Sequence, residues 1–332
     1  MERFNMWHEK GTATTRSGCR LAGNCLLVAS SLLAFVQGPN IARAADLQTD
    51  ASKVMLQSGD RPIAVYQYAF DSHAQHPAKP FVASLCSPGG VHVLRDSPSD
   101  HKHHHGLMFA VAVDGVDFWS ENPTCGKELD RSQGKLQVEA RHAPERVTIG
   151  PQSIDWTAPS GKALLRETRR ICVRQAPDAK ATLVTWQTQL APAGTQAVKL
   201  TGATYFGLGM RFVQSMDTGG RFVNADGKTG VSETNNARSA WCAYSASAEG
   251  KPVTVAMFDA PSNVRHPATW FTMDQGFAYL AATLDLSRQP LAIEPGKPLE
   301  LCYHVAVWDG TVDAADVAAL YRQAVAAGKD GK

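Results

Sequence analysis

Residues 164–190 read LLRETRRICVRQAPDAKATLVTWQTQL. In two parts of this stretch, residues 164–173 and 181–190, apolar and polar side chains alternate, and Pro177 and Asp178 interrupt the pattern between them. A period of two places successive side chains on opposite faces of a β-strand, and Pro and Asp are typical of turns. The stretch therefore predicts two β-strands joined by a turn.

The same pattern of short alternating runs, broken by Gly, Pro, Asn and Asp, continues from residue 61 onward. A spacing of about ten residues between turns is typical of an all-β sandwich or barrel. The sequence shows no internal repeat and no low-complexity linker. We therefore predict an all-β fold, a single large two-sheet antiparallel β-sandwich over residues 61–328. Further strands are expected at 63–68, 81–85, 91–94, 107–113, 136–142, 152–157, 198–206, 210–213, 254–259, 277–284, 291–293 and 299–307.

The only strong helix signal lies at the end of this domain, over residues 313–327. Asp313 is suited to cap the first turn, Asp316 adds a favourable negative charge there, and Gly328 ends the helix. The apolar stripe consists of Val317, Leu320, Tyr321, Ala324 and Val325. Such a stripe is typical of a helix with one buried face.

Residues 1–44 have the features of a secretory signal peptide. Two arginines precede an apolar run at 26–36, and Ala-Arg-Ala at 42–44 is a small-x-small cleavage pattern. No apolar run approaches the roughly 20 residues that a membrane span needs. We therefore expect a periplasmic or secreted protein without a membrane span, whose mature chain begins with a short N-terminal segment, 45–60.

The charge of the chain limits the classes of partner to expect, and its cysteines limit the kinds of metal site. The chain has 33 Lys and Arg and 31 Asp and Glu, and without residues 1–44 these counts are 28 and 29. A balance near zero gives no electrostatic reason to expect binding to nucleic acid or to an anionic membrane. The five cysteines after residue 44 form no C-x-x-C pair, which disfavours a zinc–thiolate cluster. We expect Cys172 and Cys302 to be buried thiols.

A dense histidine cluster, DHKHHHG at residues 100–106, is the strongest candidate for a functional site. Imidazoles can bind a transition metal through a neutral nitrogen, or transfer protons near neutral pH. In an extended segment His101, His103 and His105 would point one way and His104 the other. Three interpretations remain open: a divalent-metal site on His101 and His103, acid–base chemistry by His103 or His104, and a solvated polar loop.

Acidic and aromatic residues follow the cluster one hairpin later. Asp117 and Glu121 are candidate general bases or metal ligands, with an exposed carboxylate as the alternative interpretation. Trp119 is a candidate platform for stacking on a sugar, or else a partly buried core residue. These residues extend the candidate site beyond the histidines.

Two later segments, 259–270 and 219–241, are expected to be loops with further polar and aromatic groups. Loops on a rigid β scaffold are common places for binding and catalytic residues. The candidates in these loops are Asn263, His266, Trp270, Glu233 and Trp241. Other chemistries lack their motifs, since the chain has no G-x-S-x-G, no phosphate-binding glycine loop and no H-E-x-x-H.

The stretch LCSPGGVHVLRDSPSDHKHHHGLMFAVAVDGVDFW, residues 85–119, resembles the signature of a bacterial family of unknown function known as PmoA-like, or methane oxygenase. DAPSNVRHPATW at 259–270 and LAIEPGKPLELCYHVAVWDG at 291–310 resemble later parts of the same family. The matching positions of the first stretch are Arg95, Asp100, His101, His103, His104 and Gly106. His105 and His304 stand where the family usually has arginine.

The resemblance implies a galactose-mutarotase-like supersandwich, in which histidine and carboxylate groups on a concave sheet handle sugars by proton transfer. Methane oxidation is disfavoured, because the methane oxygenase subunits span a membrane and this chain has no predicted span. The implied function is a secreted carbohydrate-active enzyme of epimerase, lyase or hydrolase type, acting on a sugar or an oxidised glycoside. The alternative is a non-catalytic glycan-binding or structural β-sandwich.

In the enzyme interpretation His103 or His104 is the general acid or base, Asp100 orients an imidazole, and Arg95 binds a substrate oxygen. The remaining catalytic candidates are Glu121 and His266. The substrate-binding candidates are Trp119, Asp117, Asn263, Trp270, Glu233 and Trp241. The expected partner is a small-molecule or oligosaccharide substrate, and the cofactor considered is a divalent metal.

Overall fold

The computed structural model describes residues 46–133, 136–141 and 146–327. The predicted signal peptide, residues 1–44, lies outside these residues, as does His142 at the end of one predicted strand. The described chain is mostly β-structure, with one long helix at its end.

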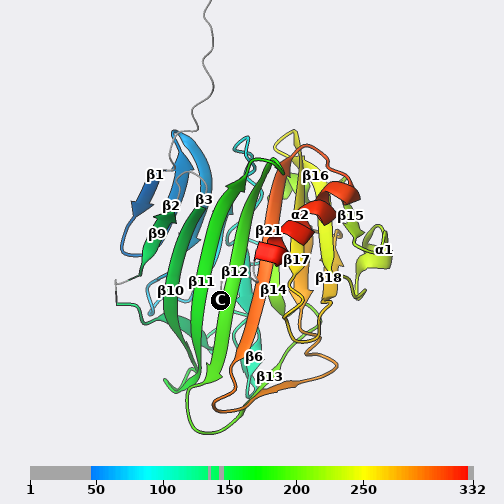
Figure 1. The fold of residues 1–332 in the computed structure, drawn as a ribbon. Coiled ribbons are helices and arrows are strands. Elements are labelled where there is room, and N and C mark those ends of the chain that lie inside the picture. Colours follow the sequence, from blue (N-terminus) through cyan, green and yellow to red (C-terminus); the bar gives the residue numbers. More distant parts are fainter. Residues whose placement is uncertain (1–45, 134–135, 142–145, 328–332) are drawn as a thin grey trace, which may run out of the picture. The chain divides into compact units, whose positions relative to one another are not determined.

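Two large antiparallel sheets and one small sheet make up the fold (Figure 1). Sheet 1 has eight strands, in the order β1 (Asp46–Thr49), β2 (Lys53–Ser58), β3 (Arg61–Gln67), β4 (Phe81–Leu85), β5 (Leu107–Ala110), β14 (Gly207–Arg211), β19 (Tyr279–Thr283) and β18 (Thr269–Met273). Sheet 2 has the order β15 (Arg221–Asn224), β16 (Trp241–Ala248), β17 (Lys251–Asp259), β21 (Leu299–Asp309), β12 (Ala181–Pro192), β11 (Ala163–Ala176), β10 (Arg146–Thr157) and β8 (Lys127–Asp130), with β9 (Val138–Arg141) also paired to β10. The small sheet consists of β20 (Leu291–Ile293), β13 (Val198–Thr201), β6 (Ala112–Val113) and β7 (Val116–Asp117). The predicted two-sheet antiparallel β-sandwich with a C-terminal helix is confirmed.

The stretch 164–190 forms the centre of sheet 2, where β11 and β12 lie side by side (Figure 1). On β11 the side chains of Leu165 and Ile171 are buried, whereas those of Arg166 and Arg170 are exposed. Because neighbouring side chains of a strand point to opposite faces, the alternation in sequence becomes an alternation between core and solvent.

Two inward positions on β11 are charged. Arg169 and Glu167 are buried and paired, with Arg169 Nε 2.6 Å from Glu167 Oε1. Arg169 also donates to Glu128 Oε2 at 3.0 Å and to the carbonyl oxygen of Pro80 at 2.9 Å. A buried charge is tolerated only where it is paired and hydrogen-bonded. The network therefore ties β11 to β8 and to the segment that precedes β4.

Several strands have no counterpart in the sequence prediction. They are β1, β2, β8, β15, β16 and β18. The first two extend sheet 1 within residues 45–60, so this stretch is part of the sandwich and not a separate N-terminal segment. β16, with the sequence WCAYSASA, lacks polar alternation because the core covers one face and a helix covers the other. The expected strand at 91–94 forms only isolated bridges.

Helix α2 (Ala314–Ala327) packs on the outer face of sheet 2 and is drawn in red in Figure 1. Its start is capped as predicted, because the Asp313 carboxylate accepts a hydrogen bond from the amide of Asp316 at 2.9 Å. Val317, Leu320 and Ala324 are buried against side chains of β16, β17 and β21. No helix in the described part of the chain is long and apolar enough to cross a membrane.

Replacement of Leu320 by alanine tests how much this helix contributes. Leu320 is 1% exposed, so Leu320→Ala should lower the free energy of unfolding by about 2–5 kcal/mol through lost burial and the cavity left behind. Denaturant unfolding followed by circular dichroism measures the change. Gln323→Ala, an exposed position on the same helix, should stay within about 0.5 kcal/mol of wild type. Equal stabilities of the two variants would contradict the packing role.

Candidate functional site

The histidine cluster lies in a tight turn that leads into β5, and not in an extended segment. The amide of His101 donates to the carbonyl oxygen of Pro98 at 3.0 Å, and the amide of His104 donates to that of His101 at 2.9 Å. Gly106 has a φ of +39°, and a Cβ there would collide with the carbonyl oxygen of Val82 on β4. The turn therefore packs closely against sheet 1.

Three histidines and a group of aromatic side chains line one pocket of about 360 Å³, the histidine pocket. The lining consists of His101, His103, His104, Trp119, Ser120, Tyr205, Phe271, Met273, Phe277 and Tyr279. His104 stacks on His101 with ring centroids 4.7 Å apart, and it meets His103 edge-on at the same distance. The alternation expected for an extended segment does not apply here, because the turn brings His104 to the same side as His101 and His103.

The histidine pocket lies on the face of sheet 1 that is turned away from sheet 2. Trp270 on β18 is buried in the core between the two large sheets, and its Nε1 donates to the carbonyl oxygen of Ser239, which precedes β16, at 2.8 Å. Phe271 and Met273 consequently point to the other face. Tyr279 on β19 is paired with Met273 and shares that face.

Strand β14 lies beside β19, which carries Tyr279 of the pocket. A Cβ at Gly209 would clash with the hydroxyl of Tyr279, so only glycine leaves room for this ring. Arg211 is paired with Tyr279 in the sheet, and its guanidinium carbon lies 3.6 Å from the ring centroid of Phe277. Arg211 Nη2 also donates to Asp100 Oδ2 at 3.0 Å. Arg211 therefore contacts both the ring of Phe277 and the turn that carries the histidines.

Asp100 contacts one imidazole of the cluster. Its Oδ2 lies 3.0 Å from His101 Nδ1 as well as 3.0 Å from Arg211 Nη2. Although burial opposes ionisation, the hydrogen bonds from His101 and Arg211 lower the pKa of Asp100. The ionised carboxylate is thus placed to orient His101, whereas the sequence analysis had no means of choosing among the imidazoles.

His103 and His104 are uncharged at neutral pH. Burial lowers the pKa of both imidazoles, and neighbouring cations lower it further, Lys79 for His103 and Arg211 for His104. The Nδ1 of His104 is buried and has no hydrogen-bond partner within the described residues. The described lining holds no carboxylate. The pocket therefore offers neutral imidazole bases among aromatic rings.

His105 is buried outside this pocket and has the most polar contacts of the cluster. Its Nδ1 lies 2.6 Å from Asp96 Oδ1 and its Nε2 lies 2.9 Å from Glu121 Oε2. Glu121 also binds Lys79 Nζ at 2.5 Å and His76 Nδ1 at 2.8 Å. Although burial opposes both charged forms, these contacts raise the pKa of His105 and hold the pKa of Glu121 well below its usual range.

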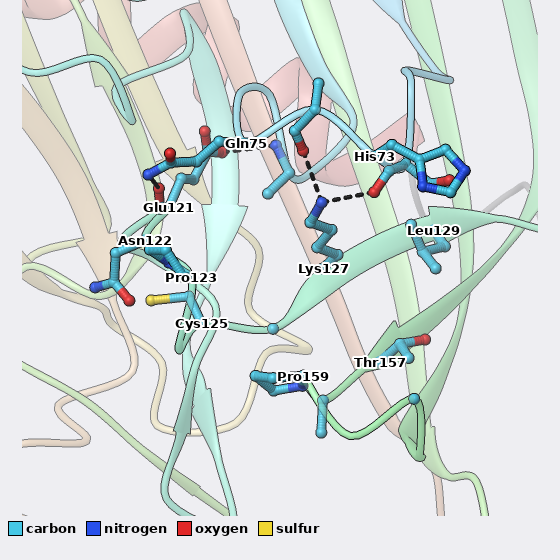
Figure 2. Close-up of a pocket in the computed structure, with 16 residues that line it drawn as sticks. His73, Gln75, Glu121, Asn122, Pro123, Cys125, Lys127, Leu129, Thr157 and Pro159 are labelled. Carbon is cyan, nitrogen blue, oxygen red and sulfur yellow. Dashed lines mark hydrogen bonds between the residues drawn. The ribbon is translucent and has the colours of Figure 1, made fainter.

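Glu121 borders a second pocket, of about 380 Å³, which Figure 2 shows. In this view Lys127 extends toward the segment that carries His73 and Gln75, and its Nζ binds the carbonyl oxygens of Ser72 and Ala74 at 2.6 Å each. Both carboxylate oxygens of Glu121 are occupied by the contacts described above and by the amide of Ala78. The structure thus places the predicted general base Glu121 outside the histidine pocket.

Asp117 positions Trp119 at the wall of the histidine pocket. Its Oδ1 accepts hydrogen bonds from the amides of Trp119 at 2.6 Å and Ser120 at 3.3 Å. The indole stacks on Phe206, with ring centroids 5.1 Å apart and planes at 12°. The carboxylate of Asp117 is therefore engaged with backbone, while Trp119 is 2% exposed and borders the pocket from the core.

The other predicted residues do not line the histidine pocket. Arg95 lies 3.8 Å from the carboxylate of Asp217, and Glu233 accepts a hydrogen bond from a backbone amide at 2.8 Å. Trp241 and Trp270 are 3% and 0% exposed. The expectation that these two tryptophans lie on loops and face a substrate is wrong, because they belong to β16 and β18 and pack in the protein interior.

Residues His266 and Asn263 belong to a separate hydrogen-bonded unit. His266 Nδ1 lies 2.7 Å from Asp259 Oδ2, and Asn263 Nδ2 donates to Asp259 Oδ1 at 2.7 Å. Asn263 Oδ1 in turn accepts the amide of Cys302 at 2.7 Å. None of these residues is part of the histidine pocket lining. Their contacts join the loop after β17 to strand β21.

Much of the pocket lining was not identified from the sequence. The unidentified residues are Ser120, Tyr205, Phe271, Met273, Phe277 and Tyr279. Phe277 and Tyr279 alternate at the start of the predicted strand 277–284, which indicates a shared face. The sequence pattern does not identify this shared face, because strand pairing determines which side of the sheet the two side chains occupy.

The divalent-metal site on His101 and His103 stays a prediction. The two imidazole centroids lie 5.8 Å apart. Within the described residues no group of three or more His, Cys, Asp or Glu side chains is arranged to hold a metal ion. A cation bound to these two histidines would therefore need further ligands from water or a substrate.

Comparisons with known proteins concern the family and the fold. The model of a family of unknown function (DUF6807) matches residues 53–322, and these comparisons give no support to the PmoA-like label. No curated protein sequence matches the chain.

Similar solved structures include the galactosidase domain of an α-galactosidase-sucrose kinase, with 9% identity, a TM-score of 0.45, and 80% of this chain and 42% of that chain covered. A galactose mutarotase-like protein from Clostridium acetobutylicum has 10% identity, a TM-score of 0.43 and coverage of 81% and 100%. A galactose mutarotase related enzyme from Lactobacillus acidophilus has 9% identity, a TM-score of 0.39 and coverage of 81% and 99%. The chain thus spans less than half of the galactosidase chain.

The buried pair of His105 and Glu121 predicts a pH-dependent contribution to stability. Because the pKa of His105 is raised on folding, its contribution is complete below its unfolded pKa and is lost as pH rises through its folded pKa. Urea unfolding of wild type and His105→Gln should therefore differ more at about pH 5.5 than at about pH 8.5. The exposed control His73→Gln should show no such difference. A gap that widens with rising pH would contradict the assignment.

Proposed function

The chain belongs to the family of unknown function DUF6807, and we propose that it is a carbohydrate-active enzyme that transfers a proton on a sugar bound in the histidine pocket. One observation carries this proposal: neutral imidazoles of His103 and His104 face an aromatic pocket whose described lining holds no carboxylate. The proposal includes export of the protein by the N-terminal signal peptide.

The lining suits a sugar because it combines apolar rings with few polar groups. Tyr205 at the rim is 37% exposed, and Phe271 and Phe277 are half-buried. Aromatic rings provide flat apolar area for the C–H faces of a sugar, while imidazole nitrogens can bind its hydroxyl groups. A pocket of this kind fixes the orientation of a monosaccharide unit through a small number of polar contacts.

His103 is the proposed general base. It is less buried than His104, and its lowered pKa keeps it unprotonated at neutral pH and ready to accept a proton. The base removes a proton from the sugar carbon next to a carbonyl or carboxyl group, and no oxidant or reductant is consumed. In elimination the C–O bond at the neighbouring carbon breaks, and the oxygen of the leaving group takes up a proton. In epimerisation a second acid, such as water, donates a proton to the opposite face of the same carbon, and His103 then releases the first proton to solvent.

The lining favours proton transfer over the hydrolytic mechanism in which two carboxylates act on the substrate. That mechanism places an Asp or Glu on each side of the scissile bond. The described lining has none, and the two candidate bases from the sequence, Asp117 and Glu121, lie outside it and are bound by donors. Epimerase or lyase chemistry on a sugar or oxidised glycoside is therefore our leading proposal.

His103→Ala tests the catalytic proposal on the mature protein with a panel of aldoses, uronides and 3-keto-glycosides. With the substrate that wild type converts, kcat should fall by about 10²–10⁴-fold, because the general base is removed. Binding measured by calorimetry should change much less. The wild-type kcat/KM should rise with pH through a pKa below that of free histidine, since only the neutral imidazole accepts a proton.

The exposed control His73→Ala should keep wild-type activity. Undiminished turnover by His103→Ala would overturn the assignment of the base. Binding of a sugar without turnover of any panel member would support the alternative of a non-catalytic glycan-binding protein. Activity that is lost on dialysis against a chelator and restored by a divalent cation would assign His101 and His103 to a metal instead.

A further inference from the structure

A second groove, of about 520 Å³, lies on the outer face of sheet 2, beside the end of helix α2. Leu183 on β12 forms part of its lining and also packs in the cluster beneath α2, which identifies the face. Three arginines, Arg146, Arg170 and Arg174, stand in the lining of this arginine groove. The histidine pocket lies on the outer face of the other sheet, so the two sites are separate.

The arrangement of the three arginines lowers the stability of the folded protein. Arg146 on β10 is paired directly with Arg174 on β11, and like charges in directly opposed positions of a sheet repel each other. Burial and the neighbouring Arg146 guanidinium lower the pKa of Arg174. Arg146 Nε donates to the Sγ of Cys172 at 3.2 Å, and no ion pair between described residues involves Arg146, Arg170 or Arg174. Three arginines and one carboxylate, Glu139, stand in the described lining. The groove therefore has an excess of positive charge.

The floor between the arginines is neutral and polar. Cys172, Thr185 and His304 are paired in one row across β11, β12 and β21. Thr185 Oγ1 lies 2.9 Å from His304 Nδ1, and burial followed by the nearby Arg174 lowers the pKa of His304 to about 4. His304 thus adds no charge to the floor at neutral pH. Cys172 is a buried free thiol, as predicted from the sequence, and Cys302 is half-buried.

The positions of the arginines indicate the kind of ligand. Unpaired guanidinium groups bind carboxylate and sulfate through paired hydrogen bonds. Arg170 and Arg174 are four residues apart on one strand, roughly 13 Å at about 3.3 Å per residue. Gln187, paired with Arg170, and the threonines of the floor provide hydrogen bonds for hydroxyl groups. The described lining has no aromatic ring on which a nucleic acid base could stack.

We propose that the arginine groove is a second binding site, which takes an acidic glycan that carries carboxylate or sulfate groups on more than one sugar unit. One anionic group binds between Arg146 and Arg174, and another binds at Arg170. The hydroxyl groups of the intervening sugar contact the neutral floor. The site does not depend on the chemistry of the histidine pocket.

Calorimetry on the mature protein tests this site with a galacturonate hexamer, a sulfated heparin hexamer, neutral maltohexaose, inorganic sulfate and a DNA hexamer. At least one of the two acidic oligosaccharides should bind, more weakly as salt rises, and maltohexaose should not bind. The double variant Arg146→Gln/Arg174→Gln and the single variant Arg170→Gln should each weaken binding by about tenfold or more. Arg166→Gln is the matched control, an exposed arginine of the same strand outside the groove, and should stay within about twofold.

A second measurement separates loss of the site from loss of the fold. Because the pair of like charges is removed, Arg174→Gln should have a Tm equal to or above that of wild type while it binds the acidic glycan more weakly. Absence of binding by both acidic oligosaccharides, or equal weakening by Arg166→Gln, would overturn the proposal. Equal affinity for inorganic sulfate would reduce the site to a simple anion site, and equal affinity for DNA would assign it to nucleic acid. Either result would also refute the glycan proposal.

Discussion

The histidine pocket depends on a buried carboxylate that is not part of its lining. Glu121 binds Lys79, His76, the amide of Ala78 and His105, all from segments distant from it in sequence. An unpaired buried charge costs about 3–5 kcal/mol, so each of these groups is tolerated only because the others are present. Since His105 follows His104 directly in the chain, the same contacts fix the turn that presents the other histidines. The chemistry of the pocket thus rests on an ion network behind it.

A second buried network reaches the same place from sheet 2. Arg169 binds Glu128 and the carbonyl oxygen of Pro80, the residue that follows Lys79. Burial outweighs the arginine and raises the pKa of Glu128 to about 8. Lys79 and Pro80 are adjacent in one short segment. They therefore connect the buried charges of sheet 2 with Glu121, which supports the histidine turn beside sheet 1. A β-sandwich with a purely apolar interior would lack this connection.

The sequence predicted those features of the fold and of the site that depend on local patterns of side chains. Alternation over residues 164–190 predicted the central strands, and the resemblance to the PmoA-like signature favoured His101, His103 and His104 over His105. The sequence could not predict that His105, alone among the histidines of the cluster, supports the turn, because this role depends on Glu121 and Asp96 lying close to His105 in space. For the same reason it could not tell that Trp270 faces the core while Phe271, its neighbour, faces the pocket. Such choices are made by strand pairing and by contacts between sheets.

The walls of the histidine pocket come from two different parts of the fold. The turn with His103, and the strands with Phe271 and Tyr279, belong to sheet 1, whereas Trp119 and Tyr205 follow strands of the small sheet. Insertions or exchanges in the connections of the small sheet can alter the shape of the cavity without disturbing the imidazoles or the ions behind them. If the pocket acts as proposed, the part that shapes it around a ligand and the part that holds its imidazoles can therefore change independently of each other.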